Sequence, residues 1–376
     1  MDCKTDIYII VNPISGSFTN TIYANIVNTI KSYLTQYTLI DISSVIATDT
    51  TLPIMDDMSD NSEPHIETIV TLSIKETPYR LIEFKTSHQN HALQVFSQIS
   101  LKDTLLIIIV GGDGTIHEVV NGLYTNCGIS IEMFPMMAIC PLGSGNHLAK
   151  LIGTETINDF YNALSIYSKS PYHATHRSII PNVITDGLNR SVLSINTIIA
   201  GMPATVNDVA SKVAGYLPNI LSSLKYEIGT VLGIFSREYF GIETVNDQMT
   251  DELECDGVDV VGLFVQVTPS CGNNFIIDKR INGNETKLSY AYIKDNYTFR
   301  IMVEFTKERV GYESTELVRR YDSDSELVLK LNLKSTAIDS TLNLKPKLTI
   351  DGQSERFEFP ATIKKSEHLL TFVSNI

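Results

Sequence analysis

The sequence predicts two domains: an α/β domain whose parallel sheet carries helices on both faces, followed by a mainly antiparallel, β-sandwich-like domain. In the first part of the chain, short and wholly apolar segments such as 105–110 alternate with helix-like segments, as in buried parallel sheets. From about Arg177, strand-like segments follow one another with few helices between them, which is typical of antiparallel sheets. The length of 376 residues also favours two domains, which we expect at 1–150 and 151–376.

In the first domain, strands and helices are predicted in alternation. Strands are expected at 6–12, 37–45, 69–74, 80–85, 105–110 and 136–140, and helices at 21–37, 86–99 and 115–123. Residues 47–67 are acidic and polar with two prolines, so we expect an exposed insertion there. Parallel strands joined by helices bring the loops after the strands to one edge of the sheet.

The second domain is predicted to be mostly strand. Strands are expected at 182–185, 191–199, 260–268, 288–293, 298–305, 326–333, 347–351 and 370–373. Residues 212–235 are helical in part, with an interruption at Pro218. The strand at 370–373 is a candidate to return to the first domain or to the region between the domains.

Composition and charge exclude several classes of protein. The formal net charge of −14 disfavours nucleic acid as a partner, because the chain repels phosphate backbones. The five cysteines form no CxxC or Cys/His cluster, so we expect reduced thiols and no zinc site. The polar start MDCKTD is unlike a signal peptide, and no apolar run approaches the roughly 18–20 residues of a spanning helix. A cytoplasmic protein is expected.

The most informative motif for function is Gly111-Gly112-Asp113-Gly114-Thr115, which joins a predicted buried strand to a helix. Glycines let a ligand approach the backbone closely, and a helix N-terminus favours an anion. The motif predicts a phosphate-binding strand–loop–helix with a carboxylate placed beside it. It is neither a Walker A loop nor GxGxxG. The plain alternative is that Asp113 only forms the turn.

Two further turns follow predicted strands, NPISGS at 12–17 and GSGN at 143–146. Each alone has a structural explanation, as a strand-ending turn or as a helix cap by Ser144. The three turns in this order make a stronger prediction. Their amides and hydroxyls could hold the phosphates of a nucleotide.

The order NPxSG, GGDGTxHEVVNGL and PLGSGNxLA resembles the catalytic domain shared by diacylglycerol kinases and sphingosine (long-chain base) kinases. Segment 86–92 (T-x-x-x-N-H-A) is similar to the family's segment that leads into the helix before GGDGT, and segments 225–230 (KYEIGT) and 348–352 (LTIDG) are similar to later motifs of that family. The resemblance covers nearly the whole chain except the insertion, and GSGN and HEVVNG are more similar to the sphingosine kinases. It implies phosphorylation of a lipid hydroxyl with ATP and Mg²⁺.

The resemblance also implies roles for individual residues. Asp113 is implied as the catalytic base for the substrate hydroxyl, with Mg²⁺ binding as its alternative role; no residue is assigned as a metal ligand. The residues implied in nucleotide binding are Asn12, Pro13, Ser15, Gly16, Ser17, Thr86, Gly111, Gly112, Gly114, Thr115, Gly143, Ser144, Gly145, Asn146, Lys225, Asp351 and Gln353. Lys225 stands where sphingosine kinases tend to have arginine, so it offers a point charge without bidentate geometry, or is a solvated surface lysine. Glu118 is as suited to capping a helix or pairing as to reacting.

The chain departs from the family where sphingosine kinases carry acidic residues that meet the amine of the lipid. The corresponding positions hold Thr205, Asn207 and Ser211, and Asp208 is displaced by one. We expect Asn207 and Asp208 to meet the substrate. Either Asp208 neutralises an amine, or the lipid carries no free amine, since a buried unpaired charge is costly. Gln353 also replaces the usual glutamate.

The leading interpretation is therefore a kinase for a sphingoid base, acting between the two domains and associating reversibly with membranes. A diacylglycerol or ceramide kinase is the alternative among enzymes. A non-catalytic nucleotide- or lipid-binding protein of the same fold is the alternative from another class. NAD kinase shares the GGDG loop, but NPxSG, GSGN and KYEIGT argue against it.

Overall fold

The computed structural model describes fifteen stretches of the chain, which form two compact units. They are residues 6–13, 15, 20–35, 66–74, 77–127, 134–169, 174–201, 203–204, 240–245, 260–271, 275–294, 318–323, 326–331, 348–355 and 357–376. The first unit comprises Met1–Ser178 and Leu369–Ile376, and the second comprises Ile179–His368. The strands predicted at 37–45 and 298–305, the helical segment predicted at 212–235 and all but the last two residues of the predicted insertion lie outside the described residues.

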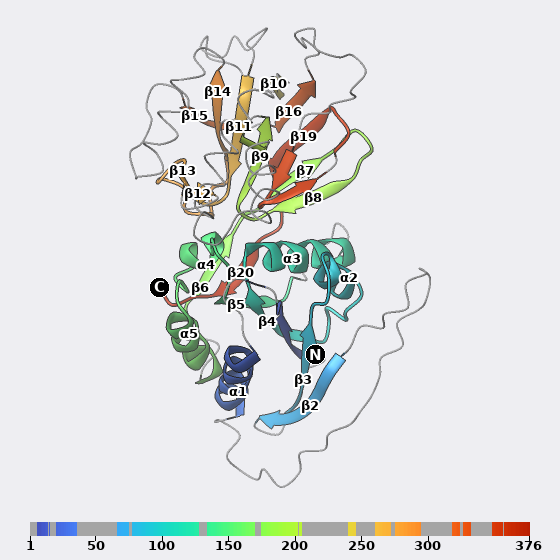
Figure 1. Ribbon diagram of the computed structural model, residues 1–376, viewed down its shortest axis with the longest axis vertical. Helices are drawn as coiled ribbons and strands as arrows, with labels where there is room; N and C mark the ends of the chain where they lie inside the picture. The colour runs from blue at the N-terminus through green and yellow to red at the C-terminus, as the bar shows by residue number, and fades with distance from the viewer. Residues whose placement is uncertain are drawn as a thin grey trace, which may run out of the picture. The chain divides into compact units, whose positions relative to one another are not determined.

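The first unit is built on a seven-stranded sheet (Figure 1). Its strands follow the order β2 (Ile66–Ile74), β3 (Thr77–Lys85), β1 (Asp6–Val11), β4 (Thr104–Gly111), β5 (Met136–Pro141), β20 (Leu370–Val373) and β6 (His176–Ile179). The pairings β3–β1, β1–β4, β4–β5 and β5–β20 are parallel, whereas β2 is antiparallel to β3. The predicted α/β fold with a parallel sheet is confirmed.

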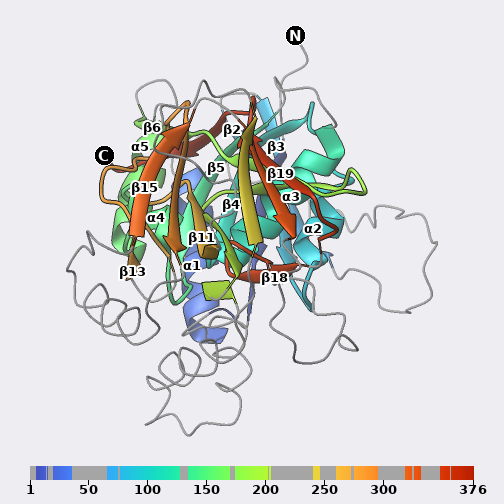
Figure 2. The same ribbon diagram turned by 90° about the horizontal axis from the view of Figure 1, so that it is seen from above.

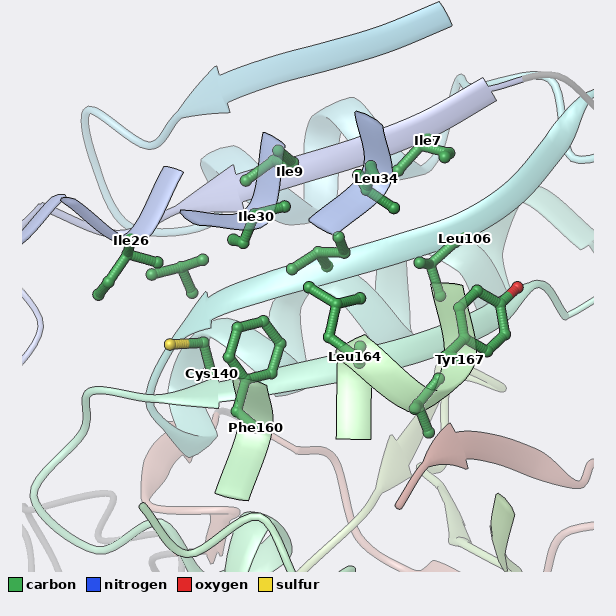
Figure 3. Packing of buried hydrophobic residues seen from close by; sticks show 14 of the residues in the cluster. Ile7, Ile9, Ile26, Ile30, Leu34, Leu106, Cys140, Phe160, Leu164 and Tyr167 are labelled. Atoms are coloured by element: carbon green, nitrogen blue, oxygen red, sulfur yellow. The ribbon is translucent and has the colours of Figure 1, made fainter. Parts of the chain in front are cut away.

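Helices cover both faces of this sheet because its central strands are apolar on both sides. On one face, α1 (Asn20–Thr35) and α5 (Ile157–Lys169) pack against β1, β4 and β5. Figure 3 shows this core, with Ile30 of α1 and Phe160 of α5 against the strands. On the other face lie α2 (His91–Phe96) and α3 (Asp113–Cys127), where the rings of Tyr8 and Phe96 meet edge to face.

Two helices differ from the sequence prediction. The helix expected at 86–99 is shorter, because the chain stays extended through Thr86, whose amide bonds the carbonyl of Val11, and Asn90 is left-handed at φ 64°. Helix α5 was not predicted, although Thr156 and Asp159 form a reciprocal cap at its start. Because α5 packs on the first sheet, the first unit extends to Ser178, whereas the sequence pattern divided the chain after residue 150.

The second unit contains an eleven-stranded sheet whose described strand pairings are all antiparallel. Its main path is β18 (Gln353–Glu355), β17 (Leu348–Ile350), β9 (Thr197–Gly201), β11 (Val260–Gln266), β10 (Phe240–Val245), β16 (Glu326–Leu331), β19 (Ala361–Lys365), β7 (Asn182–Thr185) and β8 (Ser191–Ser194). β14 (Leu288–Lys294) also pairs with β11 and carries β15 (Val318–Ser323) at its outer edge, as Figure 2 shows from above. A small hairpin joins β12 (Ser270–Cys271) to β13 (Phe275–Ile276).

The strand predicted at 191–199 is broken in two. β8 ends at Ser194 and β9 begins at Thr197, and the turn between them donates its amides to the carboxylate of Asp351. The strand at 370–373 lies in the first sheet, parallel to β5, so the predicted return to the first domain is confirmed. Among the described residues, no helix has the length and apolar character needed to cross a bilayer.

Candidate functional site

The carboxyl ends of four adjacent parallel strands bring the predicted loops together. Val11 of β1 is in register with Lys85 of β3 and with Val110 of β4, and Gly111 is in register with Pro141 of β5. The chain segments that follow these strands therefore leave the sheet at one edge. This was the expectation from the alternating pattern, and the register confirms it.

The loop after β1 is fastened to both of its neighbours. The side-chain nitrogen of Asn12 donates to Thr115 Oγ1 at 2.9 Å, which joins this loop to the start of α3. Ser15 Oγ donates to the carbonyl of Leu142 at 3.3 Å, which joins it to the loop after β5. Asn12 and Ser15 thus orient the loops, whatever further contact they make with a ligand.

The loops after β4 and β5 touch through their glycines. A Cβ on Gly143 would lie 2.5 Å from Gly112 Cα, and a Cβ on Gly112 would lie 2.7 Å from Gly143 Cα. Neither position has room for a side chain. A Cβ on Gly111 would lie 2.8 Å from Oγ1 of Thr115, in the first turn of α3, so a side chain at position 111 would clash with the start of that helix. The glycines permit the loops to pack against one another, in addition to exposing backbone.

Several loop amides that were expected to hold phosphates are already used. The amide of Ser15 donates to the carbonyl of Asn12, that of Thr115 donates to Gly112, and that of Gly143 donates to Asn146 Oδ1 at 2.9 Å. No contact described for this part of the chain uses the amides of Ser144 or Gly145. In the part of the chain that the structure describes, the GSGN loop therefore retains backbone donors at Ser144 and Gly145, whereas the amides of Ser15 and Thr115 in the other two loops already have partners.

Asp113 connects the two glycine motifs. It is the first residue of α3, and its oxygens accept the amides of His147 at 3.1 Å and Leu148 at 3.2 Å. These amides open α4 (His147–Leu151), so the carboxylate caps a helix from outside it. If Asp113 only formed its own turn, its carboxylate would not accept these two amides of a distant segment. A carboxylate has about four lone-pair sites, so two remain for chemistry.

A second carboxylate of α3 acts in the same way on the segment after β3. Glu118 is 8% exposed, and its two oxygens accept the amides of Asn90 at 2.9 Å and Ala92 at 3.2 Å. These amides open α2, which carries the Asn-His pair of the T-x-x-x-N-H-A segment. Of the roles considered for Glu118, capping is the one that the structure describes.

Thr86 and His91 flank this second helix start. The amide and Oγ1 of Thr86 donate to the carbonyl of Val11 at 2.9 and 3.4 Å, so Thr86 lies beside Asn12. The amide of Ser87 donates to His91 Nδ1 at 3.0 Å. Burial, and then the neighbouring His88, lower the pKa of His91 to about 4, so its ring is neutral near pH 7.

Two predicted nucleotide-binding residues, Asp351 and Gln353, lie among the described residues of the second unit. Asp351 and Gly352 both have positive φ in the tight turn between β17 and β18, as a type I′ hairpin requires. The Asp351 carboxylate accepts Ser194 Oγ at 2.8 Å and the amides of Ile195, Asn196 and Thr197. Its described contacts hold the β8–β9 turn. Gln353 begins β18 and is partly exposed.

The remaining predicted site residues are Gly16, Ser17, Lys225, Asn207 and Asp208, together with Thr205 and Ser211, and they lie outside the described residues. Of the predicted nucleotide-binding residues, the first unit brings together Asn12, Pro13, Ser15, Thr86, Gly111, Gly112, Gly114, Thr115, Gly143, Ser144, Gly145 and Asn146, along with Asp113. Glu118 and His147 are the site residues that the sequence did not assign. The repeated Asn-His pair at 90–91 and 146–147 is the signal that would have pointed to them.

Among the described residues, few side chains are suited to binding a metal ion or to acting as a reactive thiol. No group of three or more His, Cys, Asp or Glu side chains among them is arranged to hold a metal ion. Cys140 and Cys271 are free thiols, and burial raises the pKa of Cys140, which lies at the end of β5. Mg²⁺ bound with a nucleotide needs only one or two carboxylates, with phosphates and water completing its shell. At the loop edge Asp113 is available for that purpose.

A family model of known proteins matches part of the first unit. Residues 59–176 match the family model of the diacylglycerol kinase catalytic domain, which takes in the GGDGT and GSGN loops. This part of the chain is thus similar to the catalytic domain of diacylglycerol kinases. The matched residues span β2 to the start of β6, so the loop after β1, with Asn12 and Ser15, stands outside the matched part of this domain.

Curated relatives match the chain over short stretches. Human sphingosine kinase 2 is 40% identical over 65 residues, which are 17% of this chain and 10% of that protein. The diacylglycerol kinase of Bacillus subtilis (strain 168) is 31% identical over 84 residues, which are 22% of this chain and 26% of that protein. The matches thus cover a tenth and about a quarter of these relatives.

The fold of the whole chain also has a counterpart among solved structures. A diacylglycerol kinase structure from Bacillus anthracis str. Sterne aligns over 100% of this chain and 98% of its own, with a TM-score of 0.55 and 14% identity. At that identity the likeness extends to the fold and no further. The likeness in fold takes in the elements of the β-rich second unit as well as those of the first.

Proposed function

We propose that this protein is an ATP-dependent lipid kinase that phosphorylates the primary hydroxyl of a sphingoid long-chain base. The observation that carries the proposal is the junction at Asp113, where one carboxylate of GGDGT holds the helix that opens after GSGN. Both motifs belong to a catalytic domain of the diacylglycerol kinase family. Phosphoryl transfer requires placement and charge stabilisation more than covalent help, and interlocked loops provide placement.

In this proposal the loops of the first unit bind the nucleotide. The amides of Ser144 and Gly145 and the hydroxyl of Ser144 serve the phosphates, and Thr86 lies beside Asn12 at the same edge. Asp351 and Gln353 of the second unit, and Gly16, Ser17 and Lys225, are further proposed nucleotide contacts. Asn12 and Thr115 hold the loops in register through their 2.9 Å hydrogen bond.

Asp113 is the proposed base. The lipid hydroxyl oxygen forms a bond to the γ-phosphorus of ATP, the bond to the β–γ bridging oxygen breaks, and ADP leaves. The hydroxyl proton passes to a carboxylate oxygen of Asp113 through a lone pair that the amides of His147 and Leu148 do not use. Mg²⁺, when bound, would neutralise charge on the phosphates, and holding it is the alternative role for Asp113.

The sequence of residues 205–211 is the basis for the proposed choice of lipid. Asn207 and Asp208 are the proposed contacts of the lipid headgroup, with Asp208 pairing with the amine of a sphingoid base. The absence of acidic residues at 205, 207 and 211 favours a second candidate, a kinase for diacylglycerol or ceramide, which carry no amine. Both substrates reside in membranes, so we also propose a cytoplasmic protein that associates reversibly with a bilayer. Sedimentation with vesicles that contain each lipid tests that association.

The direct experiment is to incubate the protein with labelled ATP and Mg²⁺ and, separately, with sphingosine, diacylglycerol and ceramide. Labelled phosphate on sphingosine, absent with Asp113→Ala, is the expected result. Label on diacylglycerol or ceramide alone supports the second candidate. Nucleotide binding by calorimetry without turnover of any lipid contradicts both, and favours a non-catalytic protein of this fold.

A further inference from the structure

One face of α3 holds α2 at three points. Glu118, Gly122 and Asn126 are spaced four residues apart, so they lie along the same side of the helix. Glu118 accepts the amides of Asn90 and Ala92 at the start of α2. Asn126 Nδ2 donates to the carbonyls of Phe96 at 3.1 Å and Ile99 at 2.8 Å, at the other end of α2.

Gly122 lets the two helices approach closely between these ends. A Cβ at Gly122 would lie 2.6 Å from the carbonyl oxygen of Leu93 and 2.9 Å from Phe96 Cβ. α2 has only six residues, too few to be stable alone. The side chain of Asn90, its N-cap residue, makes no capping hydrogen bond. The start of α2 therefore depends on Glu118.

The start of α2 in turn holds the end of β3. The first residue of α2, His91, accepts the amide of Ser87 at Nδ1, and Ser87 Oγ lies 3.0 Å from the same nitrogen. Ser87 follows Thr86, whose amide and hydroxyl donate to the carbonyl of Val11. Val11 precedes Asn12.

These contacts close into a ring within the first unit. Asn12 donates to Thr115 of α3, and Glu118 lies one turn further along α3. The chain of contacts runs from α3 through Asn12 and Thr86 to α2 and returns to α3 at Glu118. Loss of Glu118 opens the ring at its buried side and leaves the Thr86 loop supported from β1 alone.

We propose that Glu118 is a positioning residue for the nucleotide, which acts through α2 by fixing Thr86 at the loop edge. The inference rests on the proposed function, because the contact of Thr86 with ATP is part of that proposal. Glu118 does not touch the reacting groups in this scheme. Its removal therefore weakens ATP binding and leaves the chemical step intact.

The test compares Glu118→Ala with Asn126→Ala. Both substitutions remove a contact of the same α3 face with α2, but only Glu118 lies at the end that holds Thr86. We expect Glu118→Ala to raise KM for ATP about tenfold, the size of a misplaced group, with kcat within about threefold. Asn126→Ala should lower Tm comparably and leave KM unchanged. Glu118→Gln, which retains one acceptor, should restore part of the affinity.

Calorimetric Kd values for ATP with the same variants separate this inference from the proposed function. No lipid turnover by the wild type, with a Kd raised by Glu118→Ala but not by Asn126→Ala, overturns the kinase proposal and retains the positioning role. An unchanged Kd and KM in Glu118→Ala, or an equal rise in Asn126→Ala, overturns the positioning role while lipid turnover stands. A wild-type protein that binds no ATP contradicts both.

Discussion

The N-termini of α2 and α4 have the same local arrangement of residues. Each follows an Asn in the left-handed region, at φ 64° for Asn90 and 51° for Asn146, and each begins with a histidine. Each is capped by a carboxylate of α3, Glu118 for α2 and Asp113 for α4. Neither asparagine side chain caps its own helix.

The two starts differ in their surroundings. Glu118 is buried, whereas Asp113 is partly exposed and adjoins the contact between Gly112 and Gly143. Asn146 also binds back to the amide of Gly143, while no described contact of this kind is made by the side chain of Asn90. The same capping chemistry is thus buried at α2 and partly exposed at α4. Three paired substitutions and one single substitution test that difference.

The largest effect is expected from the two capping carboxylates. Asp113→Ala should lower kcat by at least about a hundredfold, the range of a lost general base, whereas Glu118→Ala should leave kcat nearly unchanged. Each variant should lose about 1 kcal/mol in the free energy of unfolding, as for a lost helix cap. Steady-state kinetics and denaturant unfolding measure both quantities. Equal losses of kcat would remove the proposed distinction.

The second effect concerns the two tight glycines. Gly143→Ala places a methyl group 2.5 Å from Gly112 Cα, and Gly122→Ala places one 2.6 Å from the carbonyl oxygen of Leu93. Both should lower the free energy of unfolding by about 1–3 kcal/mol through overpacking. Only Gly143→Ala should also abolish ATP binding, because it separates the two glycine loops. Retained affinity in a folded Gly143→Ala protein would contradict this assignment.

The third comparison is between the left-handed asparagines. Asn146→Gly loses the 2.9 Å bond to the Gly143 amide and should lower stability by about 1 kcal/mol. Asn90→Gly relieves a left-handed backbone and should change stability by less than about 0.5 kcal/mol. Thermal unfolding of the two variants side by side measures the difference, and a larger loss in Asn90→Gly would reverse the interpretation.

The smallest effect at neutral pH belongs to His91. Its pKa is lowered from 6.5 to about 4 in the folded state, so the unfolded chain binds the proton more readily. Stability should therefore fall as pH drops from about 6.5 towards 4, and be fully present above 6.5. His91→Asn, which keeps an acceptor for the Ser87 amide, should flatten the Tm profile over that range. A profile parallel to that of the wild type would exclude this contribution.

Local patterns predicted much of the fold and the loops of the site. The apolar runs that became β1, β4 and β5 are buried on both faces, so composition alone identified them. The glycine motifs were placed correctly because each follows such a strand. Helix α5 was not predicted, although the sequence contains the Thr156 and Asp159 that cap its start.

The contacts between segments that are distant in the chain could not be predicted from the sequence. Asp113 and Leu148, or Glu118 and Asn90, are far apart in the chain, and no spacing rule relates them. The carboxylate of Asp351 was expected at the nucleotide, whereas its described partners are the amides of a turn about 155 residues earlier in the chain. Capping between elements depends on how helices pack, which single-residue patterns do not encode.

The place of β20 has a consequence for how the protein is made. The first sheet includes residues 370–373, which a ribosome synthesises long after the other strands of that sheet. Until then β5 and β6 lack the strand that lies between them. The second unit, which is continuous from Ile179 to His368, can fold during translation, whereas the sheet of the first unit is completed only after it. A nascent chain halted before Leu370 should therefore present the GGDGT and GSGN loops on an unfinished sheet.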